Sequence, residues 1–366
     1  MKYLRQAAGW GLIGLTVLVA AEIAARVDDW VREDIPLFAS PDQGDLQVVD
    51  AYGIHGRPFA KFQNWKLNNF GFRGADIRLE RADDCERVMI LGASEAFGYL
   101  EAPGMEFPAQ LGRLLSKNGC FEVINAAIVG MELASMRRYW ETWASRFRPD
   151  LVVIYPSPHF YLNESVNRRA VGQPGPLPKL ADPQAAPWSS RFVYRLHNVF
   201  HFPYFVQKYR NERNIAHQVA GKDPSWYFRD VPQERVRMFG TELEMLATSI
   251  QQAGATPVLM AHAFRATRPP RPEDYRDLEA FRVFMPRAPA DVIVAFEEAA
   301  NAEIRRIAAA RGLVLVEPSA KVSGCRDCFG DLVHFTDRGA AMVAAAVAET
   351  IQPVLTASRR PTRAVQ

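Results

Sequence analysis

The stretch Arg87-Val88-Met89-Ile90-Leu91-Gly92-Ala93-Ser94 is an apolar run that ends in a serine on a turn of small residues. Such a run predicts a buried strand, and Gly92 with Ala93 predicts a tight turn that presents the Ser94 hydroxyl beyond the strand. Much further along, Asp331 and His334 lie three residues apart, just before the last helix-like segment. A serine becomes a good nucleophile when a histidine takes its proton and a carboxylate orients that histidine. These residues therefore predict a nucleophilic hydrolase, and the order Ser…Asp…His differs from the orders in chymotrypsin-like and subtilisin-like chains.

Strand and helix patterns alternate on both sides of this serine. Strands are expected at 87–91, 122–125, 151–155, 256–262 and 313–317, and helices at 107–117, 133–147, 233–253, 291–311 and 337–351. Repeated strand–helix units predict a central parallel sheet covered by helices on both faces, which is an α/β three-layer sandwich. Ligands bind such sheets beyond the carboxyl ends of the strands, where Ser94 is expected.

The expected organisation has four parts. Residues 1–27 are expected to be a membrane anchor, 28–84 an irregular extension, 85–355 the α/β domain, and 356–366 a tail. An insertion at about 157–230 interrupts the alternation, with a proline-rich part followed by an aromatic part. The aromatic part could form a substrate lid, face a membrane, or pack on its own domain.

The N-terminal segment has the composition of a membrane span. Lys2 and Arg5 precede residues 7–21, which carry no charge, and the apolar pattern continues to Ala25. This is about the length needed to cross a bilayer, and the positive flank predicts that the following domain lies outside the cytoplasm, on the periplasmic side. A cleaved signal peptide, with a site near Ala20, and a buried soluble helix are alternatives. We favour the uncleaved anchor because the helical pattern runs on through Val27 without a turn.

The composition limits the other possibilities. The chain has 366 residues, of which 48% are hydrophobic and 23% charged, and its net charge is +3. These values predict one large folded domain, and without a dense basic block we expect no nucleic-acid partner. We also expect neither a metal nor a cofactor.

Four cysteines fit an extracytoplasmic domain. Cys85 and Cys120 each precede a predicted strand, and the starts of neighbouring parallel strands are adjacent, so a Cys85–Cys120 disulfide is reasonable. Cys325 and Cys328 form a Cys-x-x-Cys before the Asp/His segment, and a short structural disulfide is favoured there. A redox pair lacks its usual setting, a zinc site lacks further ligands nearby, and buried free thiols remain the alternative.

Several blocks together resemble the SGNH (GDSL-type) hydrolase superfamily, in its bacterial membrane-anchored branch. The blocks are Leu91-Gly92-Ala93-Ser94-Glu95-Ala96-Phe97-Gly98, then Glu106-Phe107-Pro108-Ala109-Gln110-Leu111, then Asn125-Ala126-Ala127-Ile128-Val129-Gly130, and last Asp331-Leu332-Val333-His334-Phe335-Thr336-Asp337-Arg338-Gly339. Leu67-Asn68-Asn69-Phe70-Gly71-Phe72-Arg73-Gly74 resembles a segment that precedes the domain in membrane-anchored members. The resemblance covers about residues 67–352 without the insertion, and it implies the flavodoxin-like SGNH fold.

The resemblance assigns a role to each catalytic residue. Ser94 is expected to be the nucleophile, His334 the general base and then the acid, and Asp331 the residue that orients His334. The backbone N–H groups of Ser94 and Gly130 are expected to bind the oxyanion, since glycine lets the backbone approach closely.

One block departs from the family pattern. The third block usually offers Gly-x-Asn-Asp after the third strand, but here residues 151–155 run into Pro156-Ser157-Pro158-His159-Phe160. Losing one oxyanion donor costs roughly 3 kcal/mol of transition-state stabilisation. His159, Ser157 or Asn163 could replace the asparagine, or the oxyanion hole is incomplete.

Three further features have two interpretations each. Glu95, directly after the nucleophile, is expected to point away from the site, into solvent or toward an arginine. His262 could line the site or be a structural histidine. Asn68, Asn69 and Arg73 could touch substrate, but a turn role is favoured.

The sequence thus predicts a membrane-anchored, extracytoplasmic serine esterase that acts on an O-acyl group, with an acylated polysaccharide as the suggested substrate. O-acetyl transfer by the same three residues is an alternative. A non-catalytic protein that binds glycan or helps assemble an export complex is the alternative from another class.

Overall fold

The computed structural model describes residues 2–33, 36–38, 46–50, 53–62, 64–82, 85–163, 202, 206 and 218–358. Its centre is a five-stranded sheet in the order β6-β5-β7-β8-β9, and every neighbouring pair is parallel. The strands are β5 (Glu86–Gly92), β6 (Phe121–Asn125), β7 (Leu151–Tyr155), β8 (Thr256–Met260) and β9 (Val314–Val316). The expected parallel α/β sheet is confirmed.

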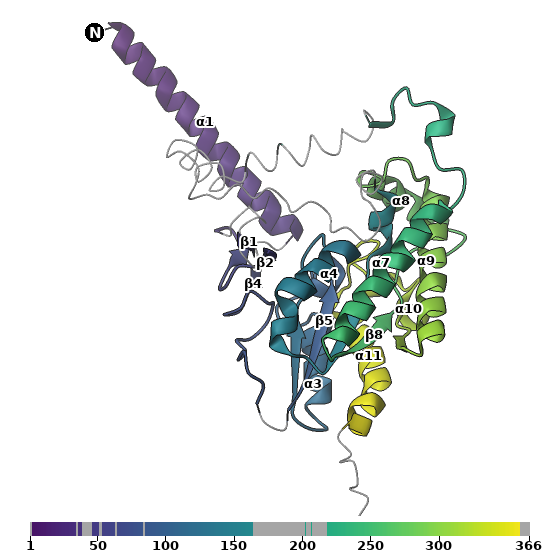
Figure 1. Ribbon diagram of the computed structural model, residues 1–366. Helices are drawn as coiled ribbons and strands as arrows, with labels where there is room; N and C mark the ends of the chain where they lie inside the picture. The colour runs from purple at the N-terminus through teal and green to yellow at the C-terminus, as the bar shows by residue number, and fades with distance from the viewer. Residues whose placement is uncertain are drawn as a thin grey trace, which may run out of the picture.

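Helices cover both faces of this sheet (Figure 1). One face packs on α4 (Leu133–Thr142), α7 (Gln233–Gln252) and α9 (Ala290–Arg311), and the other packs on α3 (Phe107–Leu115) and α11 (Asp337–Ser358). Alternate strand residues point to opposite faces, so Met89 and Leu91 enter the first core while Val88 and Ile90 enter the second. Each fully buried side chain of this size contributes about 1.5–3 kcal/mol, which is why these strands are apolar throughout. The result is a three-layer sandwich.

Most elements differ from the expected bounds by one or two residues, and three differences affect the packing, the site or the domain end. The helix expected at 133–147 breaks after Thr142 and continues as a 3-10 helix, η2 (Ala144–Phe147). Trp143, at the break, stacks on His55 with ring centroids 4.0 Å apart, a tertiary contact that the local pattern does not encode. Strand β8 ends at Met260, which leaves His262 in the following loop, and α11 runs to Ser358, past the expected domain end at 355.

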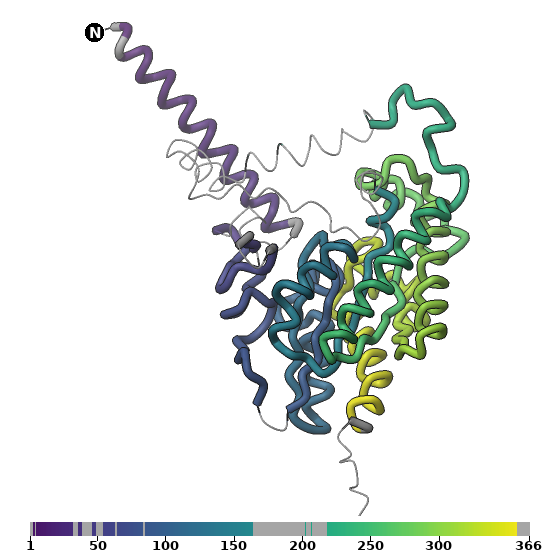
Figure 2. The backbone as a smooth tube through the Cα atoms, viewed as in Figure 1, coloured from purple at the N-terminus to yellow at the C-terminus, as the bar shows by residue number. Residues whose placement is uncertain are grey.

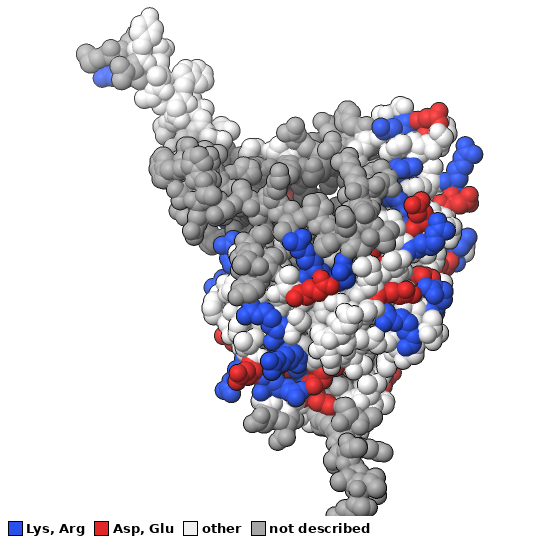
Figure 3. All heavy atoms as spheres, viewed as in Figure 1, with Lys and Arg blue, Asp and Glu red and all other residues white. Residues whose placement is uncertain are grey.

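The N-terminal helix α1 (Lys2–Glu33) projects away from the sandwich (Figures 1 and 2). Arg5–Val31 is long and apolar enough to cross a membrane, with a mean hydropathy of 1.8, and none of its most apolar window is buried. The projecting part of the molecule is almost free of charged side chains, whereas the body carries many (Figure 3). Helix α11 also passes this length-and-composition test, but half of its window is buried because it covers the sheet.

The segment expected to be irregular contains short strands. These are β1 (Gln47–Asp50), β2 (Gly53–Gly56), β3 (Lys61–Phe62) and β4 (Trp65–Lys66), which form two antiparallel pairs. The favoured turn role of Asn68 is confirmed, because its Oδ1 accepts the backbone N–H groups of Phe70 at 2.9 Å and Phe72 at 3.0 Å. Beyond this turn, Arg73 forms an antiparallel bridge with Asn125 at the outer edge of β6.

Both expected disulfides are present. Cys85–Cys120 joins the starts of β5 and β6, and Cys325–Cys328 lies in the loop before α11. Most of the expected insertion at about 157–230, including its aromatic part, lies outside the described residues, as does the end of the tail after Ser358. The domain boundaries therefore stay predictions.

Candidate active site

Ser94 lies where β5 turns into the short helix α2 (Ser94–Phe97), at the carboxyl end of the sheet. The turn needs glycine at position 92, because a Cβ there would lie 2.5 Å from Cβ of Ala96 and 3.1 Å from the carbonyl oxygen of Tyr155. Helix α2 ends at Gly98, whose φ of 86° is left-handed and favours glycine. The local sequence therefore fixes the position of the serine backbone.

The Asn125 side chain holds α2 from the neighbouring strand. Its Nδ2 donates to the carbonyl oxygen of Ala96 at 3.1 Å, and its Oδ1 accepts the N–H of Ala127 at 3.2 Å. The loop then reaches Gly130, which has a φ of 76° and would be strained with any other residue. The second motif block thus packs directly against the serine block.

Asp331 and His334 form a tight pair. Oδ2 of Asp331 lies 2.6 Å from Nδ1 of His334, and Oδ1 accepts the N–H groups of Val333 and His334, both at 2.8 Å. Burial alone lowers the pKa of His334, but the hydrogen bond and charge of Asp331 outweigh it and raise the pKa above its ordinary value of 6.5. Burial raises the pKa of Asp331, and the hydrogen bond and charge of His334 outweigh that effect and lower it. The pair therefore favours a negative Asp331 beside a histidine that binds a proton readily.

The segment after α2 links this pair to Ser94. The N–H of Tyr99 donates to the carbonyl oxygen of Ser94 at 3.2 Å, and the Tyr99 ring lies 4.9 Å from the His334 ring. The N–H of Ala102 donates to Asp337 at 2.9 Å. Both predicted loops therefore lie at one end of the sheet.

Ser94 and His334 are not hydrogen-bonded in this conformation. Among the described residues, the buried Nε2 of His334 has no hydrogen-bond partner, and the Ser94 hydroxyl donates to Oε2 of Glu95 at 3.3 Å. Catalytic hydrogen bonds are often long or misaligned without substrate, so this geometry leaves the predicted pairing open.

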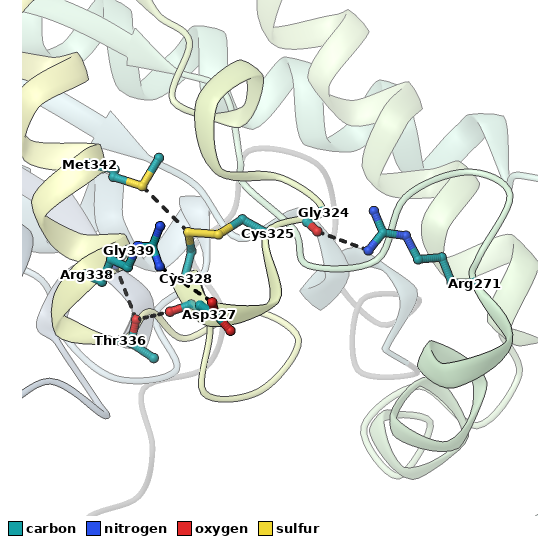
Figure 4. Close-up of a disulfide and its surroundings, with 9 residues drawn as sticks. All are labelled: Arg271, Gly324, Cys325, Asp327, Cys328, Thr336, Arg338, Gly339 and Met342. Carbon is teal, nitrogen blue, oxygen red and sulfur yellow. Dashed lines mark hydrogen bonds and ion pairs between the residues drawn. A yellow bond between two sulfur atoms is a disulfide. The ribbon is translucent and has the colours of Figure 1, made fainter.

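The Cys325–Cys328 disulfide steadies the loop that carries Asp331 (Figure 4). The carbonyl oxygen of Asp327, inside the disulfide turn, accepts the Thr336 hydroxyl at 2.7 Å. That hydroxyl also accepts the N–H of Gly339 at 3.3 Å, in the first turn of α11. The loop is thus tied at both ends, to the disulfide turn and to the final helix.

Glu95 does not point into solvent or toward an arginine, so that expectation is wrong. Its side chain is buried, with Oε1 accepting the Ser157 hydroxyl at 2.8 Å and lying 3.3 Å from Nε2 of His262. The start of α2 turns Glu95 toward the ends of β7 and β8, where these partners supply a proton donor and a positive charge. Burial raises the pKa of Glu95, but the hydrogen bond from His262 and the charges of His159 and His262 outweigh it and lower the pKa well below the usual range.

His262 lies between two carboxylates. Its Nδ1 is 2.7 Å from Oε2 of Glu297, on α9, and its backbone is held by Asn301, which accepts the His262 N–H at 2.7 Å. Burial lowers the pKa of His262, but the charges and hydrogen bonds of Glu297 and Glu95 outweigh it and raise the pKa to about 10. Burial likewise raises the pKa of Glu297, and the charge of His262 with the hydrogen bonds of His159 and His262 lowers it to about 2.

Three residues were expected as possible replacements for the family's oxyanion-donating asparagine, and their surroundings differ. His159, in the 3-10 helix η3 (Pro158–Leu162), is buried with Nδ1 3.5 Å from Oε1 of Glu297. The Ser157 hydroxyl already donates to Glu95. Asn163 ends η3, and its carbonyl oxygen accepts Arg235 of α7 at 2.9 Å. The role of each as an oxyanion donor stays a prediction.

The sequence analysis did not anticipate the cluster of Glu95, His159, His262 and Glu297. A signal for three of them was available, because Glu95, His159 and His262 each follow the carboxyl end of a strand, the edge where ligands bind. Glu297 has no such signal, since it lies in the middle of a helix and reads as an ordinary surface glutamate beside Glu298.

Comparisons with known proteins were made for the sequence and for the fold. No protein-family model matches the chain, and no curated protein does. Solved structures that resemble its fold include proteins named as an acetylxylan esterase and as a GDSL-like lipase.

Three of these structures illustrate the extent of the likeness. TesA has a TM-score of 0.43 and 14% identity, over 74% of this chain and 99% of TesA. Axe2, an acetylxylan esterase from Geobacillus stearothermophilus, has a TM-score of 0.42 and 13% identity, over 73% and 94%. A GDSL-like lipase from Bacteroides thetaiotaomicron has a TM-score of 0.39 and 13% identity, over 74% and 89%. At these values the functional argument rests on this chain's own residues.

Proposed function

We propose that the protein is a serine esterase that acts through Ser94, His334 and Asp331. The observation that carries this proposal is the Asp331–His334 pair at 2.6 Å, whose buried Nε2 has no partner among the described residues. The pair shares one end of the sheet with Ser94, and Tyr99 contacts both. A histidine that is oriented on one nitrogen and free on the other is what a serine nucleophile requires.

The proposed reaction begins with attack by Ser94. As its Oγ bonds to the ester carbonyl carbon, Nε2 of His334 takes the hydroxyl proton, and Asp331 stabilises the positive imidazolium through Nδ1. The carbonyl oxygen becomes an oxyanion, and the backbone N–H groups of Ser94 and Gly130 are its proposed donors. His334 then gives its proton to the leaving alcohol oxygen as the ester bond breaks, which leaves an acyl group on Ser94. Water, deprotonated by the same histidine, then attacks the acyl carbon; the bond to Ser94 Oγ breaks, the histidine returns the proton to Oγ, and the acid leaves.

The substrate and location are proposed from the N-terminal half. The uncharged stretch 7–21 of helix α1 supports anchoring in a membrane, and Lys2 with Arg5 supports a domain outside the cytoplasm. The resemblance of the motif blocks to the SGNH superfamily suggests an O-acyl group on a surface or exported polysaccharide. If a sugar hydroxyl replaces water in the second half of the reaction, the same residues transfer the acyl group instead.

One observation favours a different class of function. The Ser94 hydroxyl donates to the buried, negatively charged Glu95, and a carboxylate beside the nucleophile opposes the oxyanion that catalysis must stabilise. A non-catalytic protein that binds glycan with this site is therefore the second candidate.

A fluorophosphonate probe, which reacts with activated serines, distinguishes the two candidates. We expect the full-length protein in detergent to be labelled and Ser94→Ala not to be. Ser116→Ala removes an exposed serine at the end of α3 and serves as the matched control that keeps its label. Absence of Ser94-dependent labelling in a folded sample overturns the enzyme proposal.

Topology needs a separate measurement. We expect alkaline phosphatase, fused after Ser358 and expressed in a Gram-negative host, to be active because it folds outside the cytoplasm. The fusion should sediment with membranes, and removal of residues 1–33 should abolish both properties. An inactive full-length fusion would contradict the proposed orientation.

A further inference from the structure

Three metal-ligating side chains meet at the carboxyl edge of the sheet, beside Ser94. Glu95 follows β5, His159 follows β7 and His262 follows β8, and all three are buried. One ligand atom from each lies within 4.8 Å of the other two. Residues from three separate strands thus converge on one point, independently of Asp331 and His334.

The distance between two of these ligand atoms suits coordination of a small cation. Zinc bonds to nitrogen and carboxylate oxygen are about 2.0–2.2 Å, so neighbouring ligand atoms in a tetrahedral site lie about 3.4 Å apart. Nε2 of His262 and Oε1 of Glu95 are 3.3 Å apart. That separation is longer than a strong charge-assisted hydrogen bond of about 2.7–2.9 Å.

Glu297 holds the histidines as the outer carboxylate of a metal site does. Metal-bound histidines usually donate their other ring N–H to a carboxylate, which fixes the tautomer and the ring orientation. Oε2 of Glu297 is 2.7 Å from Nδ1 of His262, and its Oε1 is 3.5 Å from Nδ1 of His159. The paired hydrogen bonds between His262 and Asn301 fix the backbone as well, at 2.7 and 2.9 Å. His262 therefore presents Nε2 toward Glu95 in a preset orientation.

Two further features of the cluster are its pair of carboxylates and one long contact. Two carboxylates, Glu95 and Glu297, are buried together, and buried charges are stable only when they are paired. Nδ1 of His159 and Oε1 of Glu297 face each other at 3.5 Å, a contact longer than a normal hydrogen bond. Both features are relieved if a divalent cation draws the rings and carboxylates together.

We propose that Glu95, His159 and His262 bind one divalent transition-metal ion of the zinc class, with Glu297 as the outer carboxylate. Two imidazole nitrogens and one carboxylate oxygen suit zinc and its neighbours rather than magnesium or calcium, which prefer oxygen. The site departs from the sequence-based expectation of no metal. It does not depend on Ser94 being a nucleophile, although a cation here would offset the charge of Glu95 next to that serine.

Metal titration of the full-length protein in detergent tests the proposal. After chelator treatment and dialysis, Zn²⁺ is titrated by calorimetry, and Co²⁺ is added in parallel because its visible absorption reports the ligands. We expect one ion per chain. His159→Gln and His262→Gln should each weaken binding by at least about 100-fold, and Glu297→Gln by about 10–100-fold, as for other outer-carboxylate changes.

Two control variants test whether the ion binds at this cluster rather than at the neighbouring histidine or serine. His334→Gln removes a histidine from the same end of the sheet without touching the cluster, and Ser94→Ala removes the neighbouring hydroxyl, so both should still bind one ion. Circular dichroism checks folding, and His159→Gln decides the question if His262→Gln does not fold. Failure of the wild-type protein to bind Zn²⁺ or Co²⁺ overturns the proposal. So does binding that survives His159→Gln or is lost in His334→Gln. Because metal content is measured without turnover, these outcomes are independent of the fluorophosphonate result.

Discussion

Asp331 contacts His334 twice, through Oδ2 to the ring Nδ1 at 2.6 Å and through Oδ1 to the backbone N–H at 2.8 Å. One carboxylate therefore fixes both the ring and the backbone of the histidine. The loop needs no substrate to set the tautomer that leaves Nε2 free to accept a proton. The orientation of His334, the proposed base, is therefore already set, whereas its proposed pairing with Ser94 is not formed in this conformation.

Asp331→Asn should reduce kcat/KM for an activated acetate ester by about 10³- to 10⁴-fold, because an amide neither holds the same tautomer nor stabilises the imidazolium. The amide oxygen can still accept the backbone N–H groups of Val333 and His334, so the melting temperature should change little. Steady-state kinetics measure the expected loss of kcat/KM, and thermal unfolding measures the expected small change in melting temperature. Asp327→Asn, at an exposed residue of the same loop that pairs with Arg338 at 3.5 Å, is the control that keeps activity. Full activity in Asp331→Asn would remove this residue from the mechanism.

The pH dependence of kcat/KM should report His334. The histidine acts as a base when neutral, and its pKa is raised above 6.5 by Asp331 and, less strongly, by the charge of Glu95. Activity should therefore rise with pH through a midpoint above 6.5, and Glu95→Gln should move that midpoint down. The contribution of the Asp331–His334 pair to the free energy of unfolding changes with pH in the opposite direction. The pair stabilises the fold fully below pH 6.5, and this stabilisation is lost as the pH rises through the folded-state pKa of His334. A midpoint at or below 6.5 would contradict the assignment.

The two disulfides should differ in what their removal changes. Cys85–Cys120 spans 35 positions and Cys325–Cys328 spans 3, and loop-closure entropy predicts losses of about 4 and about 2 kcal/mol of unfolding free energy. The first joins strand starts, far from Ser94, whereas the second supports the loop of Asp331. Double alanine variants, compared by denaturant unfolding and by kinetics, should show the larger stability loss for the first pair and the larger activity loss for the second. The reverse ranking would show that the short disulfide does not steady the catalytic loop.

Arg73→Ala should be strongly destabilising. Nε of Arg73 lies 3.4 Å from Oε1 of Glu106, both side chains are almost fully buried, and the guanidinium also lies 5.0 Å from the Phe97 ring of α2. Removing one partner leaves a buried carboxylate unpaired, at a cost of about 3–5 kcal/mol measured by denaturant unfolding. The double change Arg73→Met with Glu106→Gln should lose less.

An exposed ion pair provides the comparison for Arg73. Arg305 pairs with Glu317 at 2.6 Å on the surface, and Arg305→Ala should cost less than about 1 kcal/mol. Equal effects of Arg73→Ala and Arg305→Ala would mean that the buried pair does not hold the N-terminal segment to the start of α3.

Most of the sheet could be predicted from the sequence because its signals are local. Leu151–Tyr155 is apolar at every position and has the predicted bounds, as expected for a strand with both faces covered. The break at Trp143 could not be predicted, since it accompanies stacking on His55, a residue 88 positions earlier in the chain. Long-range packing of this kind leaves no periodic pattern.

The site was predictable to a lesser extent. Asp331 and His334 lie on one loop, so their pairing could be inferred from spacing alone. Glu95 was misplaced because its partners Ser157 and His262 follow β7 and β8, and sequence spacing does not show which strands are neighbours. His262 was left with two interpretations, and its contacts with Glu95 and Glu297 show a buried, charged histidine between two carboxylates.

The bridge between Arg73 and Asn125 has a consequence for self-association. Exposed strand edges can pair with another copy and start aggregation, and proteins avoid this by covering or shortening them. Here the N-terminal segment occupies part of the outer edge of β6, and the opposite edge strand, β9, is three residues long. A domain held at high local concentration along a surface by its own helix would meet its copies often. Because one edge is partly covered and the other is short, such encounters offer little exposed strand for pairing between copies.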